Sequence, residues 1–380
     1  MAPPVWTQFV FDGTGELDIE KWRQAVHLAS EKNPGARLVL RGKLGMSYWM
    51  DSGKTPPVTE VDGSKWTGFH PENIPPCLFN TYDVKKGPTC EVVLVHADPL
   101  RVIFRTHHGV MDGRGTFVWA EDICRALRGE SILGADSAVT DYELARALGK
   151  AARTPFPFDN VNPTGRAQGR IPGVTYFRKW RKGKFHSLLG QAAILAAKEA
   201  WKHQDGKVRF AIPVDMRRHL KGVRSTANLT MPIYIEVTRA STPESISQSV
   251  TSQLEAHAEG MLDKGDPLIN WTPMKLIEHK WRTLATEYHK KGLYRTSGVI
   301  SNMGAVPPMH IFSGGGFEAN HFWPIPPAYD FIPFFLGLAS SEGSLEVIVS
   351  MPKVLASGGR IEHITSTIID GLEAATVDNK

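Results

Sequence analysis

The chain has 380 residues, of which 42% are hydrophobic and 22% are charged, and this composition is typical of a globular protein. The length exceeds what one ordinary core fills, so two domains are expected. The sequence has no run of about 18 apolar residues, which argues against a membrane span. A formal net charge of +5 suits an anionic cofactor or an acidic protein. No nucleic-acid-binding motif accompanies this charge, so no nucleic-acid partner is expected.

The cysteines and the first residues of the chain indicate in which cellular compartment the protein is expected. Cys77, Cys90 and Cys124 are an odd number without CxxC spacing, so they predict neither a disulfide framework nor a zinc site. The first residues lack the basic and then apolar pattern of a signal peptide. We therefore expect a cytoplasmic protein.

Residue periodicity predicts helices and strands in the first part of the chain. A helix is expected to begin at Asp18, because a Ser, Thr, Asp or Asn often caps the first turn and apolar residues then recur at helical spacing. The Pro-, Gly- and Asp-rich stretch 51–80 is expected to be loop. The other predictions in this part are a strand over 5–11 that turns at 12–13, paired strands over 38–40 and 46–50, a hairpin of strands over 91–96 and 101–106, and a helix over 116–128.

The second part repeats this mixture, which indicates an α/β or α+β class with two related lobes. We predict a first lobe over 1–152, a crossover linker over 153–184, dense in Pro, Gly and Asn up to 175, and a second lobe over 185–380. The basic cluster 178–184 has two interpretations, a solvated charge run in a loop or an anion-docking patch. Helices are expected over 186–203, 243–262, 273–290 and 359–374, and strands over 207–214, 228–238, 296–300, 331–338 and 345–351.

The stretch Thr106–Gly113 ends an apolar strand with two adjacent histidines and an Asp-Gly pair. Successive side chains of a strand point to opposite faces, so His107 and His108 do not readily bind one metal ion, and no metal site is predicted. A lone strand histidine is usually a satisfied core residue. The full HHxxxDG pattern, however, is expected by chance roughly once per thousand or more chains of this length. The pattern therefore favours a functional site, with one histidine packed and one facing a cavity.

HHxxxDG is the motif of the acyltransferase superfamily that includes chloramphenicol acetyltransferase (CAT), the condensation domains of nonribosomal peptide synthetases and the plant BAHD acyltransferases, and this chain resembles that superfamily. Further segments resemble its motifs in the expected order: GELDIEKWRQAV, YDVKKGP, AIPVDMRRHL, TANLTMPI and ISNMG. The chain is shorter than usual condensation domains and lacks the BAHD motif DFGWG, so no subfamily is assigned.

The resemblance implies two CAT-like lobes, each a mixed β-sheet flanked by helices, with a tunnel at their interface. It implies that His108 is the general base, a role suited to an imidazole that titrates near neutral pH. Asp112 would be structural and pair with Arg217 or, as second choice, with Arg218; the alternative is that Arg217 is only a surface charge. Gly113 lies where its N–H can stabilise an oxyanion. His107 would support the structure, and Ser301 and Asn302 are candidate substrate-binding residues or, alternatively, a capped turn.

The predicted activity is a condensation-type acyl transfer to an amine or hydroxyl of a small-molecule acceptor. The expected donor is acyl-coenzyme A or a phosphopantetheine-bound acyl group on an acidic acyl or peptidyl carrier protein, with no tightly bound cofactor. The length and Met1 start favour a stand-alone enzyme of natural-product biosynthesis. Two alternatives stay open: altered chemistry in the same tunnel, such as cyclisation or dehydration, and a non-catalytic module that docks a carrier protein.

Overall fold

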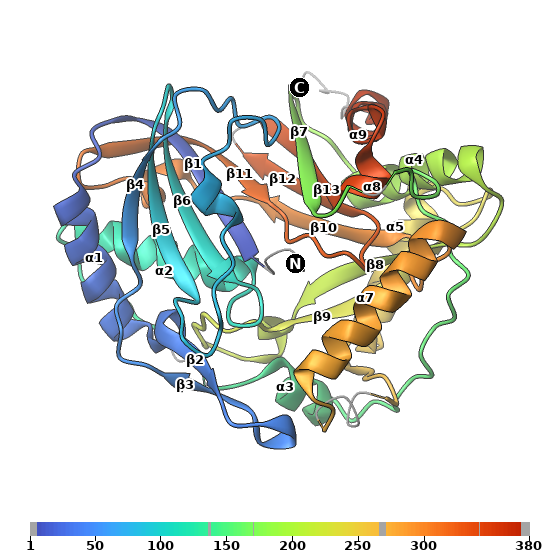
Figure 1. Ribbon diagram of the computed structural model, residues 1–380, viewed down its shortest axis with the longest axis horizontal. Helices are drawn as coiled ribbons and strands as arrows, with labels where there is room; N and C mark the ends of the chain where they lie inside the picture. Colours follow the sequence, from blue (N-terminus) through green and yellow to red (C-terminus); the bar gives the residue numbers. More distant parts are fainter. Residues whose placement is uncertain (1–5, 136–137, 170, 266–270, 342, 374–380) are drawn as a thin grey trace, which may run out of the picture.

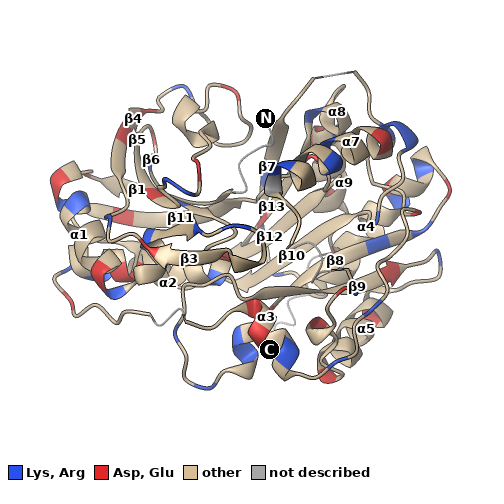
Figure 2. Cartoon of the chain, turned by 60° about the horizontal axis from the view of Figure 1, so that its bottom comes forward, with Lys and Arg blue, Asp and Glu red and all other residues tan. Residues whose placement is uncertain are grey.

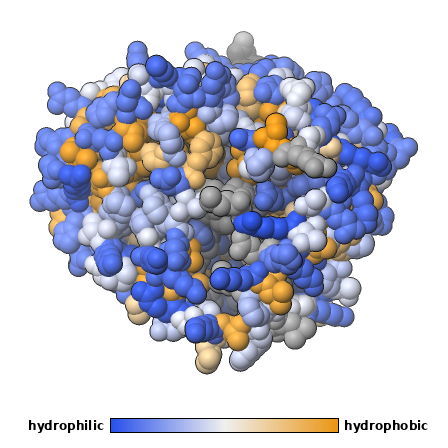
Figure 3. Space-filling view, viewed as in Figure 1, coloured by the Kyte–Doolittle hydropathy of each residue, from blue (hydrophilic) through white to orange (hydrophobic). Residues whose placement is uncertain are grey.

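Two mixed β-sheets flanked by helices form the two lobes of the chain (Figure 1). The structure is a computed structural model that describes residues 6–135, 138–169, 171–265, 271–341 and 343–373. Among these residues, no helix has both the length and the apolar character to cross a membrane. Charged residues of both signs are spread over both lobes (Figure 2). Hydrophilic side chains cover most of the face shown in Figure 3.

The first lobe is built on a five-stranded sheet with the order β11-β1-β6-β5-β4, in which only β4 and β5 pair in parallel. Helices α1 and α2 pack against each other and bury an aromatic-rich core against this sheet. Helix α1 begins as predicted, because the Asp18 carboxylate accepts from the N–H groups of Glu20 and Lys21. The elements of this part of the chain are β1 (Trp6–Gly15), α1 (Ile19–Lys32), β2 (Leu38–Arg41), β3 (Tyr48–Asp51), β4 (Val58–Asp62), β5 (Cys90–His96), β6 (Leu100–His107), α2 (Gly113–Leu127) and α3 (Asp141–Ala147).

The second lobe is built on a six-stranded sheet with the order β7-β13-β12-β10-β8-β9. Helices α4, α5 and α9 cover one face of it, and the alanine-rich side of α4 lies in the core. The elements of this second part of the chain, of which β11 belongs to the first sheet, are β7 (Val174–Lys182), α4 (Leu188–His203), β8 (Val208–Asp215), β9 (Thr230–Val237), α5 (Pro243–Glu255), α7 (Met274–Lys291), β10 (Gly298–Ala305), β11 (Phe317–Ile325), β12 (Phe335–Ser341), β13 (Ser344–Pro352), α8 (Lys353–Ala356) and α9 (Arg360–Gly371). The 3-10 turns are η1 (Pro34–Arg37), η2 (Leu44–Met46), η3 (Pro76–Phe79), η4 (Met216–His219), η5 (Ala258–Gly260) and η6 (Met309–Phe312).

The predicted class, two lobes with mixed sheets flanked by helices, is therefore confirmed. The boundaries at residues 152 and 185 stay a prediction, and two strands belong to a sheet that these boundaries do not assign to them. β11 comes from the second half of the chain but is an edge strand of the first sheet, paired with β1. β7 lies inside the predicted linker but is an edge strand of the second sheet, paired with β13.

Three local predictions were wrong, and two elements were missed. The first strand does not turn at 12–13 but continues to Gly15 through a bulge between Asp12 and Gly13. Residues 58–62 form β4, not loop, because they pair in parallel with the buried strand β5. The basic cluster begins in strand β7 and not in a loop, and its Arg178 is buried in an ion pair with Glu346. Helix α3 and strand β11 were not predicted at all.

Candidate active site

The HHxxxDG motif occupies the junction between the central hairpin of the first sheet and helix α2. His107 is the last residue of β6, as its Cα register with Trp6 of β1 shows. The chain then turns tightly, because the His107 carbonyl accepts from the N–H groups of both Val110 and Met111, at 2.8 and 3.1 Å. Helix α2 begins at Gly113. The two histidines are thus held between a rigid strand and a rigid helix.

The His108 ring is held by its own loop. Its Nδ1 lies 3.2 Å from the carbonyl oxygen of Met111. Because a carbonyl only accepts, Nδ1 carries the proton in this contact, and the lone pair of the neutral ring is on Nε2. Among the described residues, Nε2 has no hydrogen-bond partner, and the residue lines a cavity. Burial lowers the pKa of His108, against the opposing effects of the Met111 carbonyl and the Asp112 charge. The ring is therefore neutral near pH 7 and has a free basic nitrogen.

His107 faces a different environment. Its ring packs edge-on against Trp6 and lies near Trp49, with ring centroids 5.9 and 6.3 Å apart. Its Nδ1 accepts from the N–H of Gly109 at 3.1 Å. Burial, with the neighbouring His108, lowers the pKa of His107 to about 4. The alternation expected from the strand thus places one histidine among aromatic side chains and the other at a cavity.

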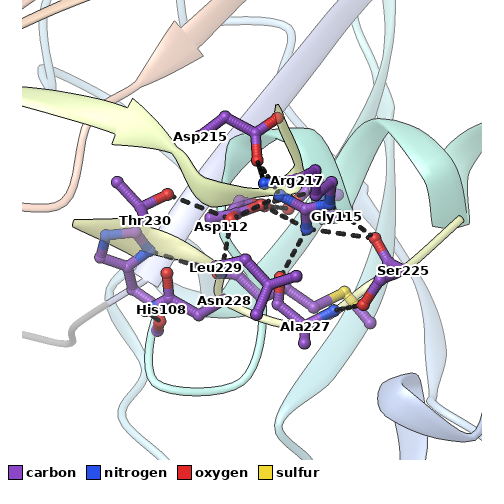
Figure 4. Close-up of polar contacts among 12 residues, drawn as sticks. His108, Asp112, Gly115, Asp215, Arg217, Ser225, Ala227, Asn228, Leu229 and Thr230 are labelled. Carbon is purple, nitrogen blue, oxygen red and sulfur yellow. Dashed lines mark hydrogen bonds and ion pairs between the residues drawn. The ribbon is translucent and has the colours of Figure 1, made fainter. Parts of the chain in front are cut away.

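Asp112 joins the two lobes (Figure 4). Its Oδ1 caps helix α2 by accepting from the N–H of Gly115 at 2.7 Å. Its Oδ2 accepts from the N–H of Leu229 at 2.8 Å and from the hydroxyl of Thr230 at 3.1 Å, both in the second lobe. Arg217 donates to both oxygens, at 2.9 and 3.1 Å. The carboxylate is 3% exposed, so this full set of donors is what makes its burial tolerable.

Arg217 is itself fixed on every side. Besides Asp112, its guanidinium donates to Asp215 at 2.8 Å and to the carbonyls of Ser225 and Ala227. Burial acts to lower the pKa of Arg217, but the charges of Asp112 and Asp215 raise it overall. The predicted contact between Arg217 and Asp112 is present. Arg218, the second candidate partner, instead lies 3.8 Å from Glu259.

The connection between β8 and β9 holds the motif from the other side. Asn228 donates its N–H to the Val110 carbonyl at 2.9 Å and its side-chain amide to the His108 carbonyl at 2.7 Å. Gly115 is required at this contact, because a Cβ there would lie 2.1 Å from the Thr226 carbonyl oxygen. Asn228 lies in the segment TANLTMPI, which was identified from the sequence only by its resemblance to a superfamily motif. The hydrogen bond from Asn228 to the His108 carbonyl was not predicted.

A cavity of about 730 Å³ lies between the lobes, and residues of both sheets line it. Gly113 lies at its wall, and as the first residue of α2 it has no helical acceptor for its N–H. Ser301 and Asn302 line it from β10, and the Asn302 side chain also accepts from the N–H of Gly304, so the capped turn is present as well. The lining includes Thr7, Phe9, His108, Asp112, Gly113, Arg114, Phe117, Asp215, Thr230, Tyr234, Ser301, Asn302, Met303, Tyr329 and Phe331.

The structure adds residues that sequence reasoning missed. Tyr329 and Phe331 line the cavity within AYDFIPFF, a segment that fits no motif of the superfamily. Burial raises the pKa of Tyr329, so its hydroxyl stays protonated and available as a hydrogen-bond donor. Arg114, directly after the motif, is an exposed cavity residue. The aromatic residues at the start of the strand predicted over 331–338 were the only available signal, and the strand itself begins later, at Phe335.

No protein-family profile and no curated protein sequence matches this chain. Solved structures do match it in fold. The condensation domain of the monacolin K polyketide synthase MokA has a TM-score of 0.62 at 10% identity, over 97% of this chain and 91% of that one. The starter condensation domain of rhizomide synthetase RzmA, in complex with C8-CoA, has a TM-score of 0.60 at 12% identity, over 98% and 92%. The epimerization domain from the third module of tyrocidine synthetase B has a TM-score of 0.57 at 14% identity, over 96% and 91%.

Proposed function

We propose that this chain, which has the two-lobed fold of condensation domains, is a condensation-type acyltransferase. One observation carries the proposal: His108 is locked through Nδ1 by the Met111 carbonyl, and its neutral Nε2 is free at a cavity between the lobes. A general base needs an unprotonated nitrogen at the operating pH, a fixed direction and access to a substrate. His108 meets these three needs, because burial lowers its pKa, the Met111 carbonyl fixes its ring and the residue lines the cavity.

The proposed reaction moves an acyl group from a thioester to an amine or hydroxyl. The acceptor nitrogen or oxygen attacks the thioester carbonyl carbon as His108 Nε2 takes its proton. The tetrahedral oxyanion then collapses, the carbon–sulfur bond breaks, and the thiolate leaves and takes up a proton. The Gly113 N–H, at the start of α2, stabilises the oxyanion together with the positive end of the helix.

The other predicted residues have supporting roles in this proposal. Asp112 and Arg217 keep the motif loop seated against the second lobe, and His107 packs the loop from behind. Ser301 and Asn302 offer polar groups to the acceptor from the opposite wall of the cavity. In this proposal the cavity between the lobes serves as the expected tunnel, which the donor would enter from one side and the acceptor from the other.

The donor is proposed to be an acyl-coenzyme A or an acyl group on a carrier protein. A domain of the same fold, that of rhizomide synthetase, is solved with C8-CoA. Both donors are thioesters of phosphopantetheine, and the net charge of +5 suits their phosphates or an acidic carrier. A role in natural-product biosynthesis is proposed because the matching domains belong to a polyketide synthase and peptide synthetases, and the cytoplasm stays the expected compartment.

The test is product formation by the purified chain and by His108→Ala. The chain is incubated with acyl-coenzyme A and acyl-carrier donors and a panel of amines and alcohols, and products are identified by mass spectrometry. The wild-type chain should form an ester or amide, and His108→Ala should reduce turnover about 10²- to 10⁴-fold while donor binding is kept. His310→Ala is the matched control, because His310 is exposed and does not line the cavity. Unchanged turnover in His108→Ala would sink the assignment of the base.

The fold match to an epimerization domain keeps a second function open, in which the same base serves altered chemistry. In such an enzyme His108 would take a proton from carbon, and product in deuterated water would gain a carbon-bound deuteron. Cyclisation or dehydration would release water or a ring product without an external acceptor. A docking module would bind a carrier protein and release no thiol from any donor.

A further inference from the structure

Three potential metal ligands converge away from the cavity. The 3-10 turn η4 ends at His219, and His257 and Glu259 lie at the turn η5 that follows helix α5. One ligand atom of each residue lies within 4.8 Å of the other two. His219 Nε2 is 2.9 Å from Glu259 Oε1, and His257 Nδ1 is 4.0 Å from the same oxygen. None of the three residues lines the cavity of the candidate active site.

The cluster contains buried polar atoms that lack partners. Glu259 is fully buried, with 0% of its side chain exposed, and its Oε2 accepts no hydrogen bond from the described residues. The buried Nδ1 of His257 has no hydrogen-bond partner among them either. Burial of a carboxylate costs free energy unless it is paired and hydrogen-bonded. The nearest arginine, Arg218, lies 3.8 Å from Oε1, and its side chain is 40% exposed. The existing contacts therefore leave Oε2 and the His257 nitrogen available for a cation.

We propose that His219, His257 and Glu259 bind a divalent transition-metal ion, with Zn²⁺ preferred. Imidazole nitrogens and a carboxylate oxygen are ligands that Zn²⁺ prefers, and two histidines with one glutamate are a known set of three protein ligands. Tetrahedral coordination with bonds of about 2.1 Å separates ligand atoms by about 3.4 Å. The observed separations of Glu259 Oε1 from His219 Nε2 and His257 Nδ1, 2.9 and 4.0 Å, lie on either side of that value, so the proposed ion would be bound after side-chain rotations that bring either oxygen of Glu259 to it. The fourth position is left for water.

The site would stabilise the turn that presents Arg217. η4 contains both Arg217, which pairs with Asp112, and His219, two residues later. A metal ion bound to His219 and to η5 ties this turn to the end of helix α5. The metal site is thus structural, and it does not depend on the activity proposed for His108.

Isothermal titration calorimetry with ZnCl₂ tests the proposal on the full chain, freed of any affinity tag and stripped with a chelator. We expect one Zn²⁺ per chain, with binding weakened by more than about 100-fold in both His257→Ala and Glu259→Gln. The matched control is His186→Ala, because His186 is exposed and lies outside the cluster, and it should bind as the wild type does.

Thermal unfolding keeps the test decisive if Glu259→Gln folds poorly. Zn²⁺ should raise the Tm of the wild type and of His186→Ala, because a ligand that binds the native state stabilises it, and should not raise that of His257→Ala. The His257 side chain is 43% exposed, so its truncation should leave the fold intact. The proposal would be overturned if the wild type bound no Zn²⁺. It would also be overturned if His257→Ala still bound Zn²⁺ and still showed the rise in Tm.

Discussion

Two buried ion pairs connect helix α2 to the second lobe, and they differ in what lies beside them. Asp112, which caps α2, pairs with Arg217, and Asp122, in the middle of α2, pairs with Arg224. Both carboxylates are nearly inaccessible, with 3% and 0% of the side chain exposed. Both arginines precede β9, and both also donate to backbone carbonyls.

The two ion pairs differ in the residues and the cavity that surround them. Asp112 follows His108 by four residues and lines the cavity, whereas Asp122 accepts from Asn33 and from the N–H groups of Leu133 and Gly134, away from the cavity. An ion pair between the lobes is therefore a structural device in both places. If His108 acts as the proposed base, its closeness in the chain to Asp112, and not the ion pair itself, distinguishes Asp112 from Asp122.

The strongest test of this comparison removes each carboxylate. Asp112→Ala and Asp122→Ala should each lower the free energy of unfolding by about 3–5 kcal/mol, because each removes the buried carboxylate of an ion pair and leaves several buried donors unpaired. Urea denaturation measures this loss. Turnover of the folded fraction should fall strongly only in Asp112→Ala. An equal fall in both variants would show that the motif pair has no special role.

A second test concerns the close approach of α2 to the second lobe. Gly115→Ala would place a Cβ 2.1 Å from the Thr226 carbonyl oxygen, so the lobes must separate, and the unfolding free energy should fall by about 1–3 kcal/mol or more. Gly113→Ala is the matched control, because its Cβ meets the Phe9 ring edge at 3.1 Å, which can shift. Gly113→Ala should instead act on acceptor binding at the cavity wall. If Gly115→Ala and Gly113→Ala were equally stable, the close contact between Gly115 and the Thr226 carbonyl would not limit the packing of the lobes.

A third test uses pH, and it addresses the packed histidine of the motif. The pKa of His107 is lowered to about 4 by burial, so between pH 4 and 6.5 the unfolded chain binds a proton that the folded chain does not. Stability should therefore fall as pH drops through this window, by at most about 1.4 kcal/mol per pH unit for this group. His107→Gln should flatten the profile of unfolding free energy against pH. His108, whose pKa is lowered in the same direction, should leave part of the slope in place.

The smallest expected effect comes from one donor to Asp112. Thr230→Val removes the hydroxyl that lies 3.1 Å from Oδ2 but leaves Arg217 and the N–H of Leu229 in place. The unfolding free energy should fall by about 1 kcal/mol, and turnover should change little. Thr14→Val is a suitable control, because this exposed threonine lies far along β1 from the motif. A large loss of turnover would mean that Thr230 contacts the substrate.

Local sequence patterns predicted correctly those elements that are determined by residues close together in the chain. The Asp18 cap, the β5–β6 hairpin and the apolar side of α4 are set by residues close together in sequence, and all are present. Strand β4 lies in a Pro- and Gly-rich stretch and is a strand because β5 offers it a parallel partner. Strand β11 is placed against β1, about 300 residues away, so no local pattern can assign it to the first sheet.

For the site, the sequence predicted two histidines of opposite direction, followed by an Asp-Gly pair and then a helix, whereas the capping of α2 by Asp112 was found only in the structure. Strand alternation is a local effect, so residue order is enough to predict it. The tertiary structure alone decided which ring nitrogen of His108 is free and which donors besides Arg217 reach Asp112. It also brought Tyr329 to the cavity and His219 to Glu259. These outcomes depend on contacts between segments that meet only when the two lobes pack, because burial and hydrogen-bond geometry are properties of the folded chain.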